Sequence, residues 1–138
     1  MNKSILVVDD DPDIQELIQA YLSDLDVDIY GTLTGEEGIE KYKELMKKGK
    51  KPDIVVMDLN LTEFGKGKID GVETTKRIMK IDPDANVYGF TAYFGTEWSK
   101  ELEEAGAKGV IARPVGFAGF REIVRKILAG EKVEIPKY

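Results

Sequence analysis

The chain has 138 residues, of which 42% are hydrophobic and 33% charged, and this balance fits one soluble globular domain rather than a disordered segment. Its 20 basic and 26 acidic side chains give a net charge of −6, which repels phosphate backbones and argues against direct nucleic-acid binding. The absence of cysteine and histidine excludes disulfides, thiolate or imidazole metal sites and histidine-based triads. Any chemistry must therefore come from carboxylates, hydroxyls, amines, backbone amides or a hard metal ion.

The sequence contains no segment that resembles a membrane span or a signal peptide. Its uninterrupted aliphatic runs, such as residues 5–8, are far shorter than the ~18 residues that a spanning helix requires. An acidic residue, Asp9, also follows the first methionine too soon for a signal peptide. We therefore expect a cytoplasmic protein with no membrane partner.

Short aliphatic runs alternate with amphipathic helical patterns along the chain. Strands are predicted at 5–8, 27–30, 54–57, 87–90 and 110–112, and helices at 14–22, 35–48, 71–80, 96–105 and 117–128. The runs lack polar alternation, which is typical of parallel strands buried on both faces. We therefore expect an α/β fold with a doubly wound, five-stranded parallel sheet and helices on both faces. This domain would occupy residues 1–130, and residues 131–138 would form a short polar C-terminal tail.

Polar side chains follow four of the predicted strands at the point where each strand ends. Asp9 and Asp10 follow the first strand, Asp58 follows the third, and Thr91 and Arg113 follow the fourth and fifth. In open α/β sheets, ligands bind at the carboxyl ends of the strands. If the strands are parallel, these groups converge on one edge of the sheet.

Such a cluster of carboxylates needs protons or a cation to offset the repulsion between its negative charges. Two carboxylates about 4 Å apart repel by roughly 4 kcal/mol at an effective dielectric constant near 20, so the cluster takes up protons or binds a cation. Oxygen ligands alone favour Mg²⁺, with Mn²⁺ as an alternative. With the repulsion reduced, Asp58 could act as a nucleophile that forms an acyl phosphate. Thr91 and Arg113 would then bind the phosphoryl oxygens.

The layout of these motifs resembles the receiver domain of two-component response regulators over residues 3–129. The matching segments are Val7-Val8-Asp9-Asp10, Val55-Val56-Met57-Asp58, Asp70-Gly71, Thr91-Ala92 and Ala105-Gly106-Ala107-Lys108-Gly109. The resemblance implies a flavodoxin-like fold with strand order 2-1-3-4-5. It also implies a phosphorylation-dependent signalling domain that accepts a phosphoryl group and is not an enzyme beyond self-directed phosphotransfer and dephosphorylation.

The resemblance implies a role for each site residue. Asp58 matches the phosphoacceptor and Thr91 the switch hydroxyl. Asp10 matches the direct Mg²⁺ ligand, and Asp9 the acid that holds a metal-bound water. The backbone carbonyl of Asn60 matches the position that completes the metal site. Arg113 stands at the phosphoryl-binding position.

The implied partners are proteins. A histidine kinase or phosphotransfer protein would supply the phosphoryl group, and a downstream target or output domain would read the result. The reading surface would be the face formed by the fourth helix, fifth strand and fifth helix. The same face could form a homodimer.

The chain departs from the family pattern in three features, and a fourth feature is expected from the resemblance alone. Arg113 replaces the family's lysine, and Val110 replaces the usual aromatic residue in the fifth strand. The loop after Asp58 is longer than in the family, with an insertion at 63–68 and Thr62 in place of the usual proline. The likeness also implies a cis peptide before the proline that follows Arg113.

Two other functions are compatible with the residues. The changes at Arg113 and Val110 suit a pseudo-receiver, a protein-interaction module that no longer switches by phosphorylation. The pattern Asp9-x-Asp11 after an apolar strand also fits a small Mg²⁺-dependent phosphatase of the haloacid dehalogenase type. The chain is short for the phosphatase fold, and its downstream motifs fit receivers better.

Overall fold

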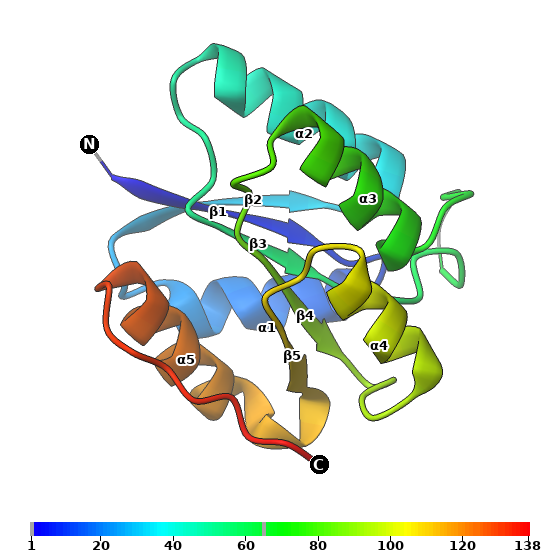
Figure 1. The fold of residues 1–138 in the computed structure, drawn as a ribbon. Coiled ribbons are helices and arrows are strands. Elements are labelled where there is room, and N and C mark those ends of the chain that lie inside the picture. Colours follow the sequence, from blue (N-terminus) through cyan, green and yellow to red (C-terminus); the bar gives the residue numbers. More distant parts are fainter. Residues whose placement is uncertain (1, 65) are drawn as a thin grey trace.

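The computed structural model describes residues 2–64 and 66–138 and places one sheet between two layers of helices (Figure 1). In chain order the elements are β1 (Lys3–Val8), α1 (Pro12–Leu22), β2 (Val27–Thr32), α2 (Gly35–Lys47), β3 (Ile54–Met57), α3 (Gly71–Ile81), β4 (Val87–Thr91), α4 (Glu97–Glu104), β5 (Gly109–Ala112), the 3₁₀ turn η1 (Arg113–Val115) and α5 (Gly116–Leu128). The five strands are parallel, in the order β2-β1-β3-β4-β5. The predicted flavodoxin-like, doubly wound fold is confirmed.

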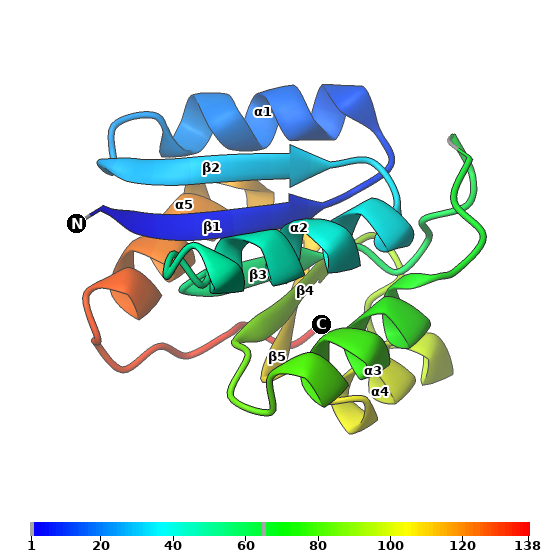
Figure 2. The same ribbon diagram turned by 90° about the horizontal axis from the view of Figure 1, so that it is seen from above.

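The aliphatic strands supply two separate cores, one on each face of the sheet. In β1, Ile5 and Val7 point into the core that contains the buried residues of α1 and α5, whereas Leu6 and Val8 point into the core that contains those of α2, α3 and α4. All four side chains are fully buried. This arrangement explains why the strand has no polar alternation: both of its faces are covered (Figure 2).

The register of the sheet aligns the strand ends that carry the polar residues. Val8 of β1 pairs with Met57 of β3, and Thr91 of β4 pairs with Ala112 of β5. Asp9 follows Val8 and Asp58 follows Met57, so both acids lie at the same edge of the sheet. The fold brings distant parts of the sequence to one place, as a parallel sheet requires.

Three details of the structure bear on the sequence predictions: the strand bounds, the peptide bond before Pro114 and the membrane-spanning potential of the helices. Strand β1 begins at Lys3 and β2 extends to Thr32, because backbone pairing continues where the side chains are polar. No peptide bond in the described part of the chain is cis, so the implied cis peptide before Pro114 is wrong. No helix in residues 2–64 and 66–138 has both the length and the apolar character needed to cross a bilayer.

Residues 131–138 form neither helix nor strand, yet they are not detached from the domain. They turn back from α5 and run along the β5 side of the sheet (Figure 1). The side chains of Val133 and Ile135 pack against the core on the α1–α5 face. The polar composition of this segment does not predict that contact.

Candidate functional site

Three carboxylates meet at the carboxyl edge of the sheet. Asp9 and Asp10 follow β1, Asp58 follows β3, and each offers an oxygen that lies within 4.8 Å of the others. Asp9 and Asp10 are each only 3% exposed, and Asp58 is half-buried. The structure thus brings together the three acids that the sequence places after neighbouring strands.

Burial and mutual repulsion make this cluster costly in its fully charged form. Burial raises the pKa of Asp9 to about 7, and the charge of Asp58 adds to the increase. Burial also raises the pKa of Asp58, although the Thr91 hydroxyl and the Arg113 guanidinium act in the opposite direction. The cluster is therefore a place where a proton or a cation is stabilised.

Backbone contacts fix the orientation of Asp58. Its Oδ1 accepts the Leu59 N–H at 2.8 Å, and its own N–H donates to the Val8 carbonyl at 3.0 Å. The loop then returns to the site, where the Gly71 N–H donates to the Leu59 carbonyl at 2.9 Å. A Cβ at Gly71 would collide with the carbonyl oxygen of Asp58, so this close approach requires glycine. The Asp70-Gly71 motif therefore has a structural role beside the site.

Thr91 and Arg113 lie at the same edge of the sheet. Thr91 is fully buried at the end of β4, and its Oγ1 accepts the Tyr93 N–H at 3.1 Å. Arg113 donates from Nη2 to the Phe90 carbonyl at 2.9 Å, and the same nitrogen lies 3.5 Å from Asp9 Oδ2. Its guanidinium carbon lies 4.4 Å from the centre of the Phe90 ring. Arg113 is thus held against β4 and the acidic cluster.

The long loop after β3 contacts the cluster directly. Asp10 Oδ2 accepts two backbone N–H groups of the loop, from Glu63 at 3.0 Å and Phe64 at 2.9 Å. The side-chain amide of Asn60 donates to Glu63 Oε2 at 3.2 Å and to the Tyr93 hydroxyl at 3.3 Å. Part of the predicted 63–68 insertion, Gly65, lies outside the described residues. The extra length of the loop was visible in the sequence, but its hold on Asp10 was not.

Asp11 has a different role from its two neighbours. Its side chain caps α1 by accepting the Asp13 N–H at 2.9 Å. Asp11 is not among the three clustered carboxylates. The structure therefore gives no support to the phosphatase interpretation, which needs both acids of the Asp9-x-Asp11 pattern at the reaction centre.

The donor set fits a hard divalent cation. All three converging side chains offer carboxylate oxygens, which Mg²⁺ and Mn²⁺ prefer over softer ligands. A cation would also offset the repulsion that raises the pKa of Asp9. The residues present therefore suit the metal that the sequence resemblance implies.

Comparisons with known proteins agree with this geometry. The family model for the response regulator receiver domain matches residues 5–125. The chemotaxis protein CheY of Thermotoga maritima is 34% identical over 128 residues, which cover 92% of this chain and 98% of that protein. The response regulator GacA of Pseudomonas viridiflava is 30% identical over 135 residues, and the match covers 96% of this chain but only 58% of GacA.

A solved structure supplies the same comparison in three dimensions. The CheX–CheY–BeF₃–Mg²⁺ complex from Borrelia burgdorferi contains a chain that is 25% identical to this one, with a TM-score of 0.76. The match covers 94% of this chain and 90% of that one. Sequence motifs, strand order and family comparison therefore agree, and the chain belongs to the response regulator receiver domains of two-component signalling.

Proposed function

We propose that the chain is a phosphorylation-dependent receiver domain in which Asp58 accepts a phosphoryl group from a histidine kinase or phosphotransfer protein. The observation that carries this proposal is the convergence of Asp9, Asp10 and Asp58 within 4.8 Å, with Thr91 and Arg113 at the same sheet edge. The CheX–CheY–BeF₃–Mg²⁺ complex from Borrelia burgdorferi supports it by similarity.

Four groups of this chain would hold the cation. Asp10 and Asp58 would bind it directly, Asp9 through a water, and the Asn60 backbone carbonyl would complete the site. Bound Mg²⁺ supplies positive charge that reduces the repulsion between the acids and an incoming phosphoryl group. The loop amides of Glu63 and Phe64 occupy Asp10 Oδ2, so we propose Oδ1 as the oxygen of Asp10 that faces the cation.

The transfer step needs no catalytic base from this chain. An oxygen of the Asp58 carboxylate attacks the phosphorus of the partner's phosphohistidine. The new P–O bond forms as the P–N bond breaks, and the electron pair of that bond returns to the imidazole nitrogen. The Leu59 N–H fixes Oδ1 of Asp58, so we assign the attack to Oδ2. Thr91 and Arg113 then bind the oxygens of the new acyl phosphate.

The phosphoryl group would change the population of two conformations. Movement of the Thr91 hydroxyl toward Asp58 would break its bond with the Tyr93 N–H and shift the β4–α4 loop. The face formed by α4, β5 and α5 would then bind a downstream protein, an output domain or a second copy of this chain. Because Val110 stands where the family has an aromatic ring, ring rotation cannot contribute here.

Phosphorylation is tested by intact-mass spectrometry after incubation with Mg²⁺ and a small acyl-phosphate donor. We expect the wild-type protein to gain the mass of one phosphoryl group and Asp58→Asn to gain none. Asp13→Asn, which removes an exposed acid from the first turn of α1, is the matched control and should behave as wild type. No mass gain in the wild type would contradict the proposal.

One observation favours a second function, the pseudo-receiver. Arg113 already bonds to the Phe90 carbonyl and approaches Asp9, so its guanidinium is committed before any phosphoryl group arrives. A pseudo-receiver predicts no response to the phosphate mimic beryllofluoride, either in wild type or in Arg113→Lys. Clear amide shifts around Thr91 on addition of the mimic would eliminate it.

A further inference from the structure

Residues 131–138, called here the return segment, run beside a groove on the α4–β5 side of the domain. The groove has a volume of about 500 Å³. Its walls come from the β4–α4 loop, from α4 and from β5, and the return segment itself forms the remaining side. The surface proposed above to bind partners is therefore partly covered by the chain's own residues.

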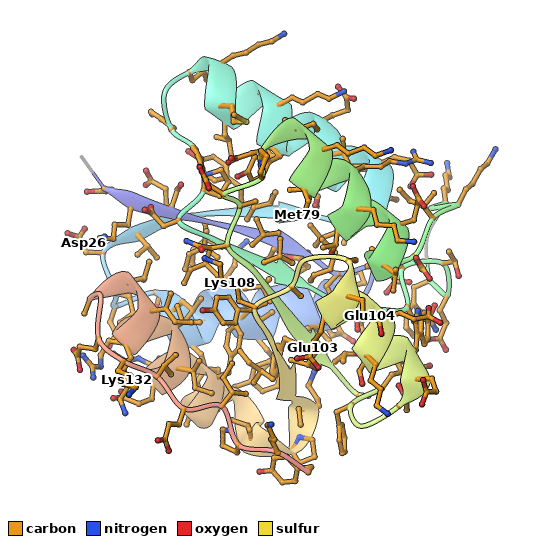
Figure 3. All side chains as sticks on the ribbon, viewed as in Figure 1. Asp26, Met79, Glu103, Glu104, Lys108 and Lys132 are labelled. Carbon is orange, nitrogen blue, oxygen red and sulfur yellow. The ribbon has the colours of Figure 1, made fainter. Side chains whose placement is uncertain are left out.

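Alternate side chains of the return segment face the domain. Val133 and Ile135 are partly buried, whereas Lys132, Glu134 and Pro136 are exposed. This period of two is that of an extended chain with one face packed. Figure 3 shows Lys132 on the outside of the molecule near the end of α5. The segment thus has an inner face that fits the domain and an outer face that suits water.

The first strand residue of β5 makes room for the inner face. A Cβ at Gly109 would lie 2.6 Å from Ile135 Cδ1, so the isoleucine packs on bare backbone. The next residue, Val110, lines the same groove. A larger aromatic side chain at this position, as in the family pattern, would take up space in the groove. Gly109 therefore leaves space for the Ile135 side chain on the α1–α5 face, whereas the Val110 side chain packs with the core on the α2–α3–α4 face.

The far end of the return segment contacts the loop that follows the switch residue Thr91. The rings of Tyr138 and Phe94 are 5.8 Å apart and meet edge to face, and the Tyr138 carbonyl lies beside Gly95. Phe94 follows Tyr93, whose N–H donates to Thr91 Oγ1 at 3.1 Å. A short, continuous set of contacts thus joins Thr91 to Tyr138.

The near end is fixed by charge and by backbone contacts. Arg125 of α5 bonds to Glu131 at 3.1 Å, and the Glu131 N–H donates to the Lys126 carbonyl at 2.9 Å. Gly130 turns the chain with a positive φ of 73°, which favours glycine. The segment therefore leaves α5 in a defined direction toward β5.

We propose that the return segment is an intrinsic wall of the α4–β5 groove that narrows this face and holds it closed to partners until the β4–α4 loop moves. The inference rests on the function proposed above, because movement of Thr91 is what removes the platform under Tyr138. Linkage makes the coupling reciprocal: if activation releases the segment, then release of the segment favours activation. Weakening the contacts of the segment must therefore raise the affinity of the site for a phosphate mimic.

The test is a beryllofluoride titration of the full chain with Mg²⁺ present, followed by the fluorescence of Trp98. This tryptophan is the only one in the sequence, and its ring lies 5.0 Å from that of Tyr93. The release variant is Ile135→Ala with Tyr138→Ala. Its matched control, Lys132→Ala with Glu134→Ala, removes one positive and one negative exposed side chain from the same segment. We expect half-saturation at about five-fold lower mimic concentration in the release variant and at the wild-type value in the control.

A second variant approaches the contact from the strand. Gly109→Ala leaves the segment's sequence intact and forces only the end of the Ile135 side chain to move. It should shift half-saturation in the same direction as the release variant. The Ile135 methyl resonances supply an independent readout, because addition of the mimic to the wild type should move them away from their packed position over Gly109 toward random-coil values.

The outcomes separate this inference from the proposed function. If all proteins respond to the mimic with equal half-saturation and the Ile135 methyl resonances do not change, the inference is overturned while phosphorylation at Asp58 remains intact. A response seen only in the release variants would support closure in its strongest form. No response in any protein would overturn both proposals.

Discussion

Buried aspartates at the two ends of the central sheet have pKa values shifted in opposite directions. At the carboxyl end, Asp9 is 3% exposed and its pKa is raised to about 7 by burial and by the charge of Asp58. At the amino end, Asp82 is similarly buried, at 6% exposure. Burial alone would raise its pKa too, but the hydrogen bonds from Lys51 and Tyr42 outweigh burial and hold the pKa below the usual range.

The difference lies in the partners and not in the burial. Asp82 Oδ2 accepts the Tyr42 hydroxyl at 2.6 Å and lies 2.7 Å from Lys51 Nζ. The nearest cationic partner of Asp9 is Arg113 at 3.5 Å, and two further carboxylates surround it. One end of the sheet is therefore electrostatically satisfied within the chain, whereas the other remains ready to accept a ligand. Such unbalanced clusters are typical of functional sites.

The largest expected effect is stabilisation by Asp9→Asn when divalent cations are absent. Because the folded state raises the carboxyl pKa from 3.8 to about 7, folding favours protonated Asp9, and stability falls as the pH rises from about 4 to about 7. Removing the charge should therefore stabilise the protein by up to about 4 kcal/mol at pH 8 and by far less at pH 4.5. Urea unfolding at both pH values, with a chelator present, measures the difference.

Asp13→Asn is the control for this change. It removes the same charge from an exposed position in the first turn of α1, so its effect should be small and unfavourable at both pH values. Destabilisation by Asp9→Asn at pH 8 would show that the acidic cluster is not under electrostatic repulsion.

The next effect is stabilisation by Mg²⁺, which should act at the carboxyl end only. A ligand that binds the folded state alone adds about 2.7 kcal/mol when its concentration is 100 times its Kd. Asp10→Asn should lose most of this gain, because it removes one of the three converging carboxylates. Thermal unfolding with increasing Mg²⁺ measures the gain. An equal gain in wild type and Asp10→Asn would contradict the metal site.

At the amino end, Tyr42→Phe should destabilise the protein. Asp82 would lose a buried donor at 2.6 Å, and a hydrogen bond to a charged group contributes about 1.5–3 kcal/mol. The lowered pKa of Asp82 gives stability that is present above pH about 4 and lost as the pH falls through the folded pKa, so the deficit should shrink at strongly acidic pH. Tyr88→Phe is the control, since the pKa of Tyr88 is raised by burial alone. A deficit in Tyr42→Phe no larger than in this control would contradict the paired state of Asp82.

The contrast between the two ends also shows what a sequence can reveal. The strands were predictable because runs such as Ile5–Val8 must be buried on both faces, and the acidic cluster followed because parallel strands end at one edge. The pairing of Tyr42 with Asp82 was not predictable, because the helical pattern that contains Tyr42 gives no information about Asp82, which lies 40 positions further along the chain.

Contacts made by backbone groups could not be predicted from the sequence, because they do not depend on residue type. The N–H groups of Glu63 and Phe64 that bind Asp10 could belong to any non-proline residue, so only the length of the loop pointed to them. The packing of Ile135 was hidden for a related reason. Its partner surface is the bare backbone of Gly109, and a glycine in the sequence does not indicate which side chain packs against it.

The smallest expected effect is that of Lys51→Ala, which separates charge from burial at the amino end. The Lys51 side chain is 42% exposed, so its pair with Asp82 is screened by solvent and should contribute less than about 1 kcal/mol. The deficit should decrease further at high salt, whereas the deficit of Tyr42→Phe should not, because that hydrogen bond is buried. Lys50→Ala, at an exposed neighbouring position, is the control and should not change stability measurably. Chemical unfolding at low and high ionic strength measures both deficits, and a loss in Lys51→Ala that equals the loss in Tyr42→Phe would mean that Asp82 depends on charge neutralisation more than on its buried donor.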